Sequence, residues 1–397
     1  MLKPLRLAFY CDYPFGSARS VETLVKLIND RMMGLQERTE VSYIANGKLE
    51  GNSESIPYNH QRLIKIRPEI FSNRLILHRF KPIGFTMNSD LFQSYDLNLI
   101  FLDRFPTRKF LKHINSEGRK IVFLLHGMDV KRITYYPLRL PLFMFLFLAQ
   151  ARLSKKYLRS RNVFFQVLNE AQRNFLIDEI LIPRSNVFLI PNGLKTDLYT
   201  TVDNRDDFNI VVLGRINKLP KGSNLLPGII KEVLKESDER LTFCIIGKGE
   251  YLSSLIKKIS DLGSEMRKRV SILGFISEVE KIKILSSGNL ILSTSYTEPF
   301  PLSILEGLYS GLKVISTNTS GVTYMLSKGE DFGTWLRPSE KDFARAILSE
   351  FRKWKDDPAS YFERKVKRAK LSKNLFNEIK MTNDYLEMIN YILEKDL

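Results

Sequence analysis

Residues 289–316, NLILSTSYTEPFPLSILEGLYSGLKVIS, contain one complete repeating unit of an α/β fold. The unit begins with an apolar run typical of a buried strand, 289–293, and passes through a loop into a segment with helical periodicity, 302–309. A second apolar run follows at 313–316. A strand, a helix and a strand in this order form a βαβ unit, whose two strands lie parallel in one sheet.

The same alternation of strand and helix continues on both sides of this stretch. Most apolar runs are nearly continuous in Val, Ile, Leu and Phe, which is typical of parallel strands buried on both faces. The predicted strands form two series, 5–10, 41–45, 97–102, 120–125, 163–168 and 187–190, then 209–213, 241–246, 270–273, 289–293 and 313–316. The predicted helices include 17–34, 168–180, 223–236, 249–260, 302–309 and 340–354.

A turn with the sequence IPNG, residues 190–193, separates the two series. We therefore predict two doubly wound, Rossmann-like α/β domains that face each other across a cleft. The first domain is predicted to span residues 1–195 and the second 196–375. The amphipathic end of the chain, 376–397, is predicted to form a helix that crosses back onto the first domain.

The composition is that of an ordinary globular protein. Of the 397 residues, 44% are apolar and 26% are charged, which excludes a disordered, collagenous or disulfide-rich chain. Cys11 and Cys244 both lie in apolar, strand-like runs, as expected in a reducing compartment. The first residues are typical of a strand rather than a signal peptide, and the longest apolar run, 140–149, is too short to cross a bilayer. We expect a cytoplasmic protein.

Positive charge is concentrated in the first half of the chain. The formal net charge is +17, and residues 1–200 hold 30 basic and 17 acidic side chains. Such an excess attracts anions, whether nucleic acid, an anionic membrane or a phosphorylated substrate. A nucleic-acid-binding protein is one reading. Against it, no binding motif is recognisable, and aromatic and basic residues are not interleaved on a predicted strand.

Two glutamates flank the start of the helix predicted at 302–309. Glu298 lies in the loop before it, and Glu306 lies just over one turn inside it. The first amides of the helix, near Leu302 and Ser303, offer free N–H groups and partial positive charge to a phosphate. The alternative is that Glu306 is a surface residue and Glu298 a helix cap.

Two cations follow the strand that ends at Gly214. Arg215 and Lys221 lie on the loop before the next helix. An arginine can bind a diphosphate through two hydrogen bonds, and a lysine can bind it as a point charge. The alternative is a solvated basic loop.

Two weaker signals lie in the first half. His126 follows a strand end, where a histidine can serve a ligand cleft or a structural hydrogen bond equally well. Gly16 lies in the first strand–helix turn. There is no GxGxxG, P-loop, HExxH, paired CxxC or GxSxG motif. An Asp-x-Asp metal-binding pair is also missing, so we predict no metal and no cofactor.

Taken in order, these segments resemble the retaining glycosyltransferases of family 4, the glycosyl transferases group 1 type, which have the GT-B fold. The similar pieces are the turn at 13–18, HG at 126–127, IPNGLKTDLY at 190–199, GRINKLPKG at 214–222, IIGKGEYLSSL at 245–255, ILGFIS at 272–277, EPFPLSILEG at 298–307 and SGLKVIS at 310–316.

The resemblance implies roles for individual residues. Arg215 and Lys221 would bind the donor diphosphate, Glu306 the ribose, and Glu298 the transferred sugar. His126 would lie near the reacting face of that sugar. The remaining implied donor contacts, largely through the backbone, are Gly16, Phe275, Ile276, Phe300, Pro301, Leu302 and Ser303. Pro301 stands where the family often has glycine, and the turn at 16–18 reads GSA where a glycine pair is usual.

The predicted function is metal-independent transfer of a sugar, with retained configuration, from a nucleotide-diphospho-sugar to a hydroxyl of a lipid-linked or polysaccharide glycan. The alternative on the same fold is a nucleotide-sugar epimerase or hydrolase. The segment 131–161 has an apolar centre between basic ends. It is either a buried helix or an interfacial segment on the inner face of an anionic membrane.

Overall fold

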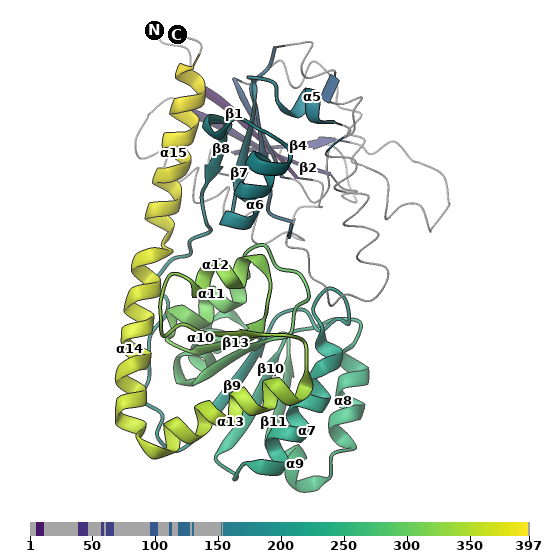
Figure 1. Ribbon diagram of the computed structural model, residues 1–397, viewed down its shortest axis with the longest axis vertical. Coiled ribbons are helices and arrows are strands. Elements are labelled where there is room, and N and C mark those ends of the chain that lie inside the picture. The colour runs from purple at the N-terminus through teal and green to yellow at the C-terminus, as the bar shows by residue number, and fades with distance from the viewer. Residues whose placement is uncertain are drawn as a thin grey trace, which may run out of the picture. The chain divides into compact units, whose positions relative to one another are not determined.

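The computed structural model describes residues 5–11, 39–46, 57–58, 61–66, 96–101, 111–112, 118–127, 129–130, 152 and 154–395. The chain divides into two compact units. The first comprises Met1–Val130, Pro137–Pro191 and Ile379–Leu397, and the second comprises Lys131–Tyr136 and Asn192–Glu378. Each unit is described by itself below (Figure 1).

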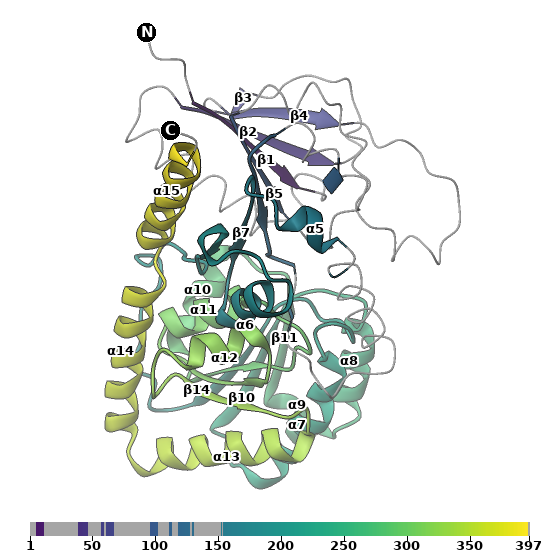
Figure 2. The same ribbon diagram turned by 45° about the horizontal axis from the view of Figure 1, so that its top comes forward.

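The first unit is built on a twisted sheet whose strand order is β3-β4-β2-β1-β5-β6-β7-β8. Apart from the antiparallel β3–β4 pair, the strands are paired in parallel, and Figure 2 shows β1, β2 and β4 side by side. The strands are β1 Leu5–Cys11, β2 Thr39–Asn46, β3 Pro57–Tyr58, β4 Gln61–Ile66, β5 Leu97–Phe101, β6 Ile121–Leu124, β7 Val163–Val167 and β8 Val187–Leu189.

All six strands predicted for this unit are present, and β3 and β4 were not predicted. The sequence of β4, QRLIKI, mixes polar with apolar residues, so it lacks the continuous apolar run on which the prediction relied. The predicted helix 168–180 is present as α6, Glu170–Asn174, and a π-helical turn, Phe175–Glu179. The predicted helix 17–34 lies outside the described residues.

Both faces of this sheet are covered along β1, β5, β6 and β7, because alternate residues of these strands enter different cores. Leu99 belongs to one core and Ile100 to the other. The core that contains Leu99 is closed by the last helix, α15, Glu378–Glu394, through apolar side chains that include Ile389. Lys120 Nζ donates to the carbonyls of residues 392 and 393, at 2.6 and 3.1 Å, and so satisfies the carbonyl end of that helix.

The second unit has a wholly parallel sheet with the order β11-β10-β9-β12-β13-β14. The strands are β9 Phe208–Leu213, β10 Leu241–Ile246, β11 Val270–Gly274, β12 Leu290–Ser293, β13 Lys313–Thr317 and β14 Gly333–Leu336. The five strands predicted here are all present. The edge strand β14 was not predicted, since its four residues, GTWL, are all partly or fully exposed. Two Rossmann-like α/β units, as predicted, are therefore confirmed.

Helices cover both faces of the second sheet. Residues of α7, α8 and α13 share one core with β9 and β10, and Figures 1 and 2 show α11 and α12 across the sheet from α8. A Cβ atom on Gly307 would lie 2.9 Å from Ile291, so glycine there lets α11 approach β12 closely. The helices are α7 Leu226–Glu236, α8 Leu252–Ser260, α9 Ser264–Lys268, α10 Glu278–Ser287, α11 Leu302–Tyr309, α12 Ser320–Leu326, α13 Glu340–Asp356 and α14 Pro358–Leu375.

The strand order of the second sheet reverses between β9 and β12. From β9 the chain proceeds through β10 to β11 on one side, and then through β12 and β13 to β14 on the other. At such a reversal the loops that leave two neighbouring strands diverge to opposite faces and open a crevice at the carboxyl ends of the strands. The fold therefore predicts a ligand site beyond the ends of β9 and β12.

Candidate functional site

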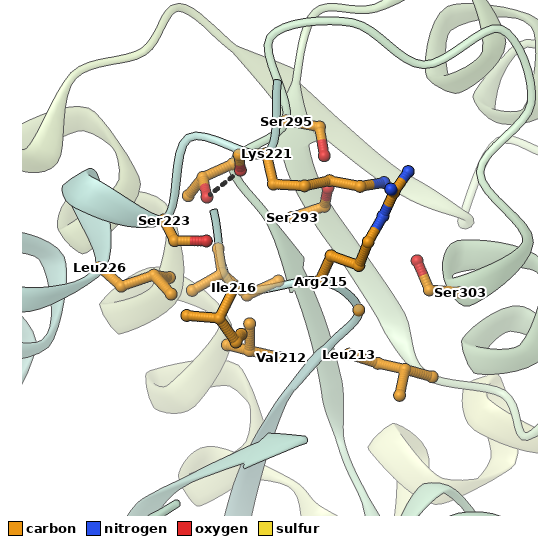
Figure 3. A pocket seen from close by; sticks show the side chains of 13 residues that line it. Val212, Leu213, Arg215, Ile216, Lys221, Ser223, Leu226, Ser293, Ser295 and Ser303 are labelled. Carbon is orange, nitrogen blue, oxygen red and sulfur yellow. Dashed lines mark hydrogen bonds between the residues drawn. The ribbon is translucent and has the colours of Figure 1, made fainter. Parts of the chain in front are cut away.

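An open hollow of about 330 Å³ lies at this reversal (Figure 3). It is lined by the end of β9, the loop that follows it, the end of β12 and the start of α11. Its polar lining includes Arg215, Lys221, Ser223, Ser293, Ser295 and Ser303. The structure therefore brings the predicted pair of cations together with the first turn of the predicted helix.

The loop after β9 is fixed against the end of β12. Gly222 has a φ of +64°, and a Cβ atom there would lie 2.0 Å from the carbonyl oxygen of Thr294. The Thr294 hydroxyl donates to the carbonyl of Lys221 at 3.1 Å, the bond drawn in Figure 3. A left-handed residue in such close contact has to be glycine. This packing sets the direction from which Lys221 enters the hollow.

The two cations differ in their partners. Lys221 has a side chain that is 22% exposed, and its Nζ contacts Oε1 of Glu298. Arg215 is exposed, and within the described part of the chain it forms no ion pair. Figure 3 shows both side chains extending toward the same region. A dianionic group in the hollow would meet the Arg215 guanidinium directly and would compete with Glu298 for Lys221.

The start of α11 adds backbone donors. Pro301 is the N-cap and its side chain makes no capping bond, so the amides of Leu302 and Ser303 precede the first hydrogen bond of the helix, from Ile304. The ring of Phe300 packs on an aromatic cluster with Tyr324 and Phe376, at centroid distances of 6.4 and 5.8 Å. The side chain of Phe300 therefore serves this cluster, and Phe300 does not line the hollow.

The two glutamates occupy separate environments. Besides contacting Lys221, Glu298 accepts a long bond from Ser295, at 3.5 Å. The side chain of Glu306 is 14% exposed, and its Oε1 accepts from Lys281 at 2.5 Å and from the Tyr199 hydroxyl at 3.1 Å. The reading of Glu306 as an ordinary surface residue is therefore wrong. Burial raises the pKa of its carboxyl, and the Lys281 ammonium opposes that rise.

His126 lies in the first unit, just after β6. Its Nε2 lies 3.1 Å from Gln166 Oε1 and 3.4 Å from the Tyr385 hydroxyl. Gln166 donates from its amide nitrogen to the carbonyl of Ile190 at 2.6 Å, which turns its oxygen toward the histidine. Nε2 therefore carries the proton. Burial lowers the pKa of His126 to about 4, so the ring is neutral at physiological pH.

Of the predicted residues that the structure describes, Arg215, Lys221 and Ser303 line the hollow, and the others do not. Phe275 and Ile276 follow β11, which is separated from β9 by β10. Phe275 is 66% exposed, and Lys248 Nζ lies 5.7 Å from its ring centroid. Gly16 lies outside the described residues.

Some residues of the site were not predicted. Ser293 ends β12 and Ser295 follows two residues later, whereas the apolar run before them marks only the strand. Tyr199 lies within the segment that already supported the resemblance, but its hydroxyl role was not foreseen. Lys281 gives no local signal, because only the packing of α10 against α11 brings it to Glu306.

The described residues contain neither a cluster of metal ligands nor a membrane-spanning helix. No three His, Cys, Asp or Glu side chains in the described ranges gather as a metal centre would require. No helix there combines the length and apolar character needed to cross a bilayer.

The sequence profile of the family described as "Glycosyl transferases group 1" matches residues 201–372. Among curated proteins, a subunit of phosphatidylinositol N-acetylglucosaminyltransferase from Arabidopsis thaliana is 29% identical over 186 residues, 46% of this chain and 40% of that protein. Its Homo sapiens counterpart is 32% identical over 163 residues, 41% of this chain and 32% of that protein. An Escherichia coli UDP-Gal:alpha-D-GlcNAc-diphosphoundecaprenol alpha-1,3-galactosyltransferase is 25% identical over 196 residues, 46% of this chain and 49% of that protein. The matches thus span less than half the length of these relatives.

Solved structures match nearly the whole chain. Anabaena HepE, in complex with UDP and glucose, has a TM-score of 0.64 at 17% identity and covers 97% of this chain and 99% of its own. WaaG, a glycosyltransferase involved in lipopolysaccharide biosynthesis, has a TM-score of 0.64 at 13% identity and covers 95% of this chain and 98% of its own. At these identities the likeness concerns the fold. The resemblance inferred from the sequence is confirmed: residues 201–372 are a glycosyl transferases group 1 domain, in a chain with the GT-B fold.

Proposed function

We propose that this chain is a retaining glycosyltransferase, which moves a sugar from a nucleotide-diphospho-sugar to an acceptor hydroxyl. The observation that carries the proposal is the pair of cations, Arg215 and Lys221, at the strand-order reversal beside the start of α11. The family match of residues 201–372 agrees with it. Because HepE is similar in fold and its structures contain UDP or UDP-glucose, a UDP-sugar is the proposed donor.

The chemistry needs stabilisation of the diphosphate as its bond to the sugar breaks. Arg215 can form two parallel hydrogen bonds to phosphate oxygens, and Lys221 adds a second positive charge. The first turn of α11 borders the same hollow through Ser303 and has free amides that can donate to a phosphate. Groups fixed before the reaction, where charge develops, stabilise a transition state most effectively. No covalent nucleophile is assigned.

Three further roles complete the proposal. Glu306 accepts hydrogen bonds from the donor ribose. Glu298 lies beside the transferred sugar, and it becomes available to the sugar when a phosphate replaces it on Lys221. His126 acts at the sugar as a neutral ring, in keeping with its lowered pKa. Phe275 and Ile276 contact the nucleotide base. Gly16 contacts the diphosphate.

The acceptor is proposed to be a lipid-linked or polysaccharide glycan. The similar proteins include a phosphatidylinositol N-acetylglucosaminyltransferase subunit and a galactosyltransferase named for GlcNAc-diphosphoundecaprenol. We assign the acceptor side to residues 1–195, with the last helix, and the donor side to 196–375. The basic excess of residues 1–200 suits an anionic membrane surface or a phosphate-bearing acceptor.

The test measures release of nucleotide from a set of UDP-sugars, with and without a polyprenyl-diphosphate glycan or phosphatidylinositol as acceptor. Acceptor-dependent release, with the sugar recovered on the acceptor in retained configuration, is the expected result. Conversion of the donor at the same rate without acceptor would instead favour the epimerase or hydrolase.

A further inference from the structure

Glu306 is held by two side chains from other parts of the second unit. Lys281 comes from α10 and Tyr199 from the loop that precedes β9. Lys281 Nζ lies 2.5 Å and the Tyr199 hydroxyl 3.1 Å from the same atom, Glu306 Oε1. No hydrogen bond among the described residues reaches Oε2. The carboxylate is thus fixed through one oxygen, and the other oxygen remains available as an acceptor.

The holding groups are themselves fixed. Tyr199 is 4% exposed, its ring packs at 70° against that of Tyr309 with 5.4 Å between centroids, and Lys373 donates to its carbonyl. Lys281, whose side chain is 14% exposed, also pairs with Glu278 at 2.7 Å. Such buried, mutually bonded groups hold a single geometry more firmly than exposed ones.

We propose that Lys281 and Tyr199 are positioning residues for the donor ribose: they fix Glu306 through Oε1, so that Oε2 accepts the ribose hydroxyls. The inference rests on the proposed function, because it takes the ribose role of Glu306 from there. It goes beyond that function because it gives a role to two residues, Lys281 and Tyr199, that act on the donor only through Glu306.

The charges around Glu306 also predict a dependence on pH. The groups that face it are Lys281 and Glu278 from α10, Tyr199 from its loop, and Tyr309 from its own helix through contact with Tyr199. Burial raises the pKa of the Glu306 carboxyl, and Lys281 counteracts that effect. Without the ammonium the pKa rises further, so the carboxylate needed for the ribose is lost as pH falls.

The experiment measures binding of UDP, ADP, GDP and CDP by calorimetry, and compares the tightest of them with its 2′,3′-dideoxy form. The dissociation constant of the dideoxy form divided by that of the parent nucleotide reports the ribose contact alone. In Lys281→Met we expect this ratio to fall about tenfold, the size of one hydrogen bond to a charged group, and to fall further at pH 6 than at pH 8. Tyr199→Phe should lower the ratio by a smaller factor, and Lys281→Arg should restore most of it. Affinity for the dideoxy form should stay within about twofold, which shows that the fold and the diphosphate contacts are intact.

Two outcomes would overturn the inference, and they differ. If the wild-type protein discriminates the ribose and Lys281→Met and Tyr199→Phe leave the ratio unchanged, the positioning role is wrong while the proposed function stands. If the wild type binds none of the four nucleotides, the proposed function fails and the inference fails with it. Should Lys281→Met fail to fold, Tyr199→Phe alone still decides the point.

Discussion

Lys221 Nζ lies against Glu298 Oε1, and this pair joins the loop after β9 to the loop that leads into α11. With side chains 22% and 15% exposed, the two groups are partly shielded from water, so their attraction is weakly screened. A diphosphate bound by Arg215 would offer Lys221 more negative charge than one carboxylate does. Donor binding is therefore expected to exchange the partner of Lys221 and to release Glu298 toward the sugar.

The first prediction concerns this exchange. Lys221→Ala should lower turnover about a hundredfold, the usual cost of removing one preorganised charge stabiliser, with little change in thermal stability. Steady-state transfer from the best UDP-sugar measures it. Lys218→Ala is the matched control, because Lys218 is an exposed lysine on the same loop that does not line the hollow. Near-normal turnover in a folded Lys221→Ala protein would show that Lys221 does not stabilise the donor diphosphate.

The second prediction concerns metal ions. If Arg215, Lys221 and the start of α11 supply the positive potential at the diphosphate, transfer should continue at an unchanged rate in excess EDTA. The measurement is the initial rate before and after chelation, with magnesium added back. A complete loss that magnesium reverses would show that a divalent ion shares the diphosphate.

Much of the second unit could be predicted from sequence, because buried parallel strands give continuous apolar runs. The runs VVL at 211–213 and KVIS at 313–316 both appear in the sheet. Arg215 and Lys221 could be predicted as a pair because one loop carries both. Strands such as β4 and β14 were missed, since partly polar or exposed strands lack that signal.

Contacts between distant segments could not be predicted. Lys281, Tyr199 and Glu306 come from three separate segments, and only the packing of α10, α11 and the loop before β9 brings them together. The resemblance supplied Glu306 as a ribose contact, but no local pattern marks the residues that hold it. The Gln166 bond to His126 is missing from the prediction for the same reason.

The third prediction follows from the partly buried His126 ring. Its pKa falls from an ordinary 6.5 to about 4 on folding, so between these values the unfolded chain binds more protons than the folded one. The free energy of unfolding should therefore decrease as pH falls from about 6.5 toward 4, by up to about 3 kcal/mol from this group. Urea unfolding across that range measures it.

The control for this effect is His126→Gln, which keeps a polar side chain but cannot titrate. Its stability should change less with acid than that of the wild type over the same pH range. Equal pH dependence in the two proteins would mean that His126 is not buried as a neutral ring.

The fourth prediction concerns the membrane. Most of the segment 131–161 lies outside the described residues, but its basic end includes α5, Lys155–Leu158. Lys156, Arg159 and Arg161 are exposed there, and Lys155 is partly exposed. Each basic group near an anionic leaflet contributes about 1 kcal/mol, and salt screens that attraction. The protein should therefore float with phosphatidylglycerol vesicles at low salt and dissociate in part at high salt.

A charge-matched pair of variants separates this surface from the overall positive charge of the chain. Changing Lys155, Lys156, Arg159 and Arg161 together to Gln should abolish most flotation. Changing four exposed basic residues of the second unit to Gln removes the same charge and should leave flotation almost intact; these are Lys257, Lys258, Arg267 and Lys268. Equal loss in both variants would mean that net charge, rather than this segment, drives binding. If the wild-type protein stays at the bottom of the gradient at low salt, membrane association is wrong, and a glycan acceptor free of the membrane becomes the better proposal.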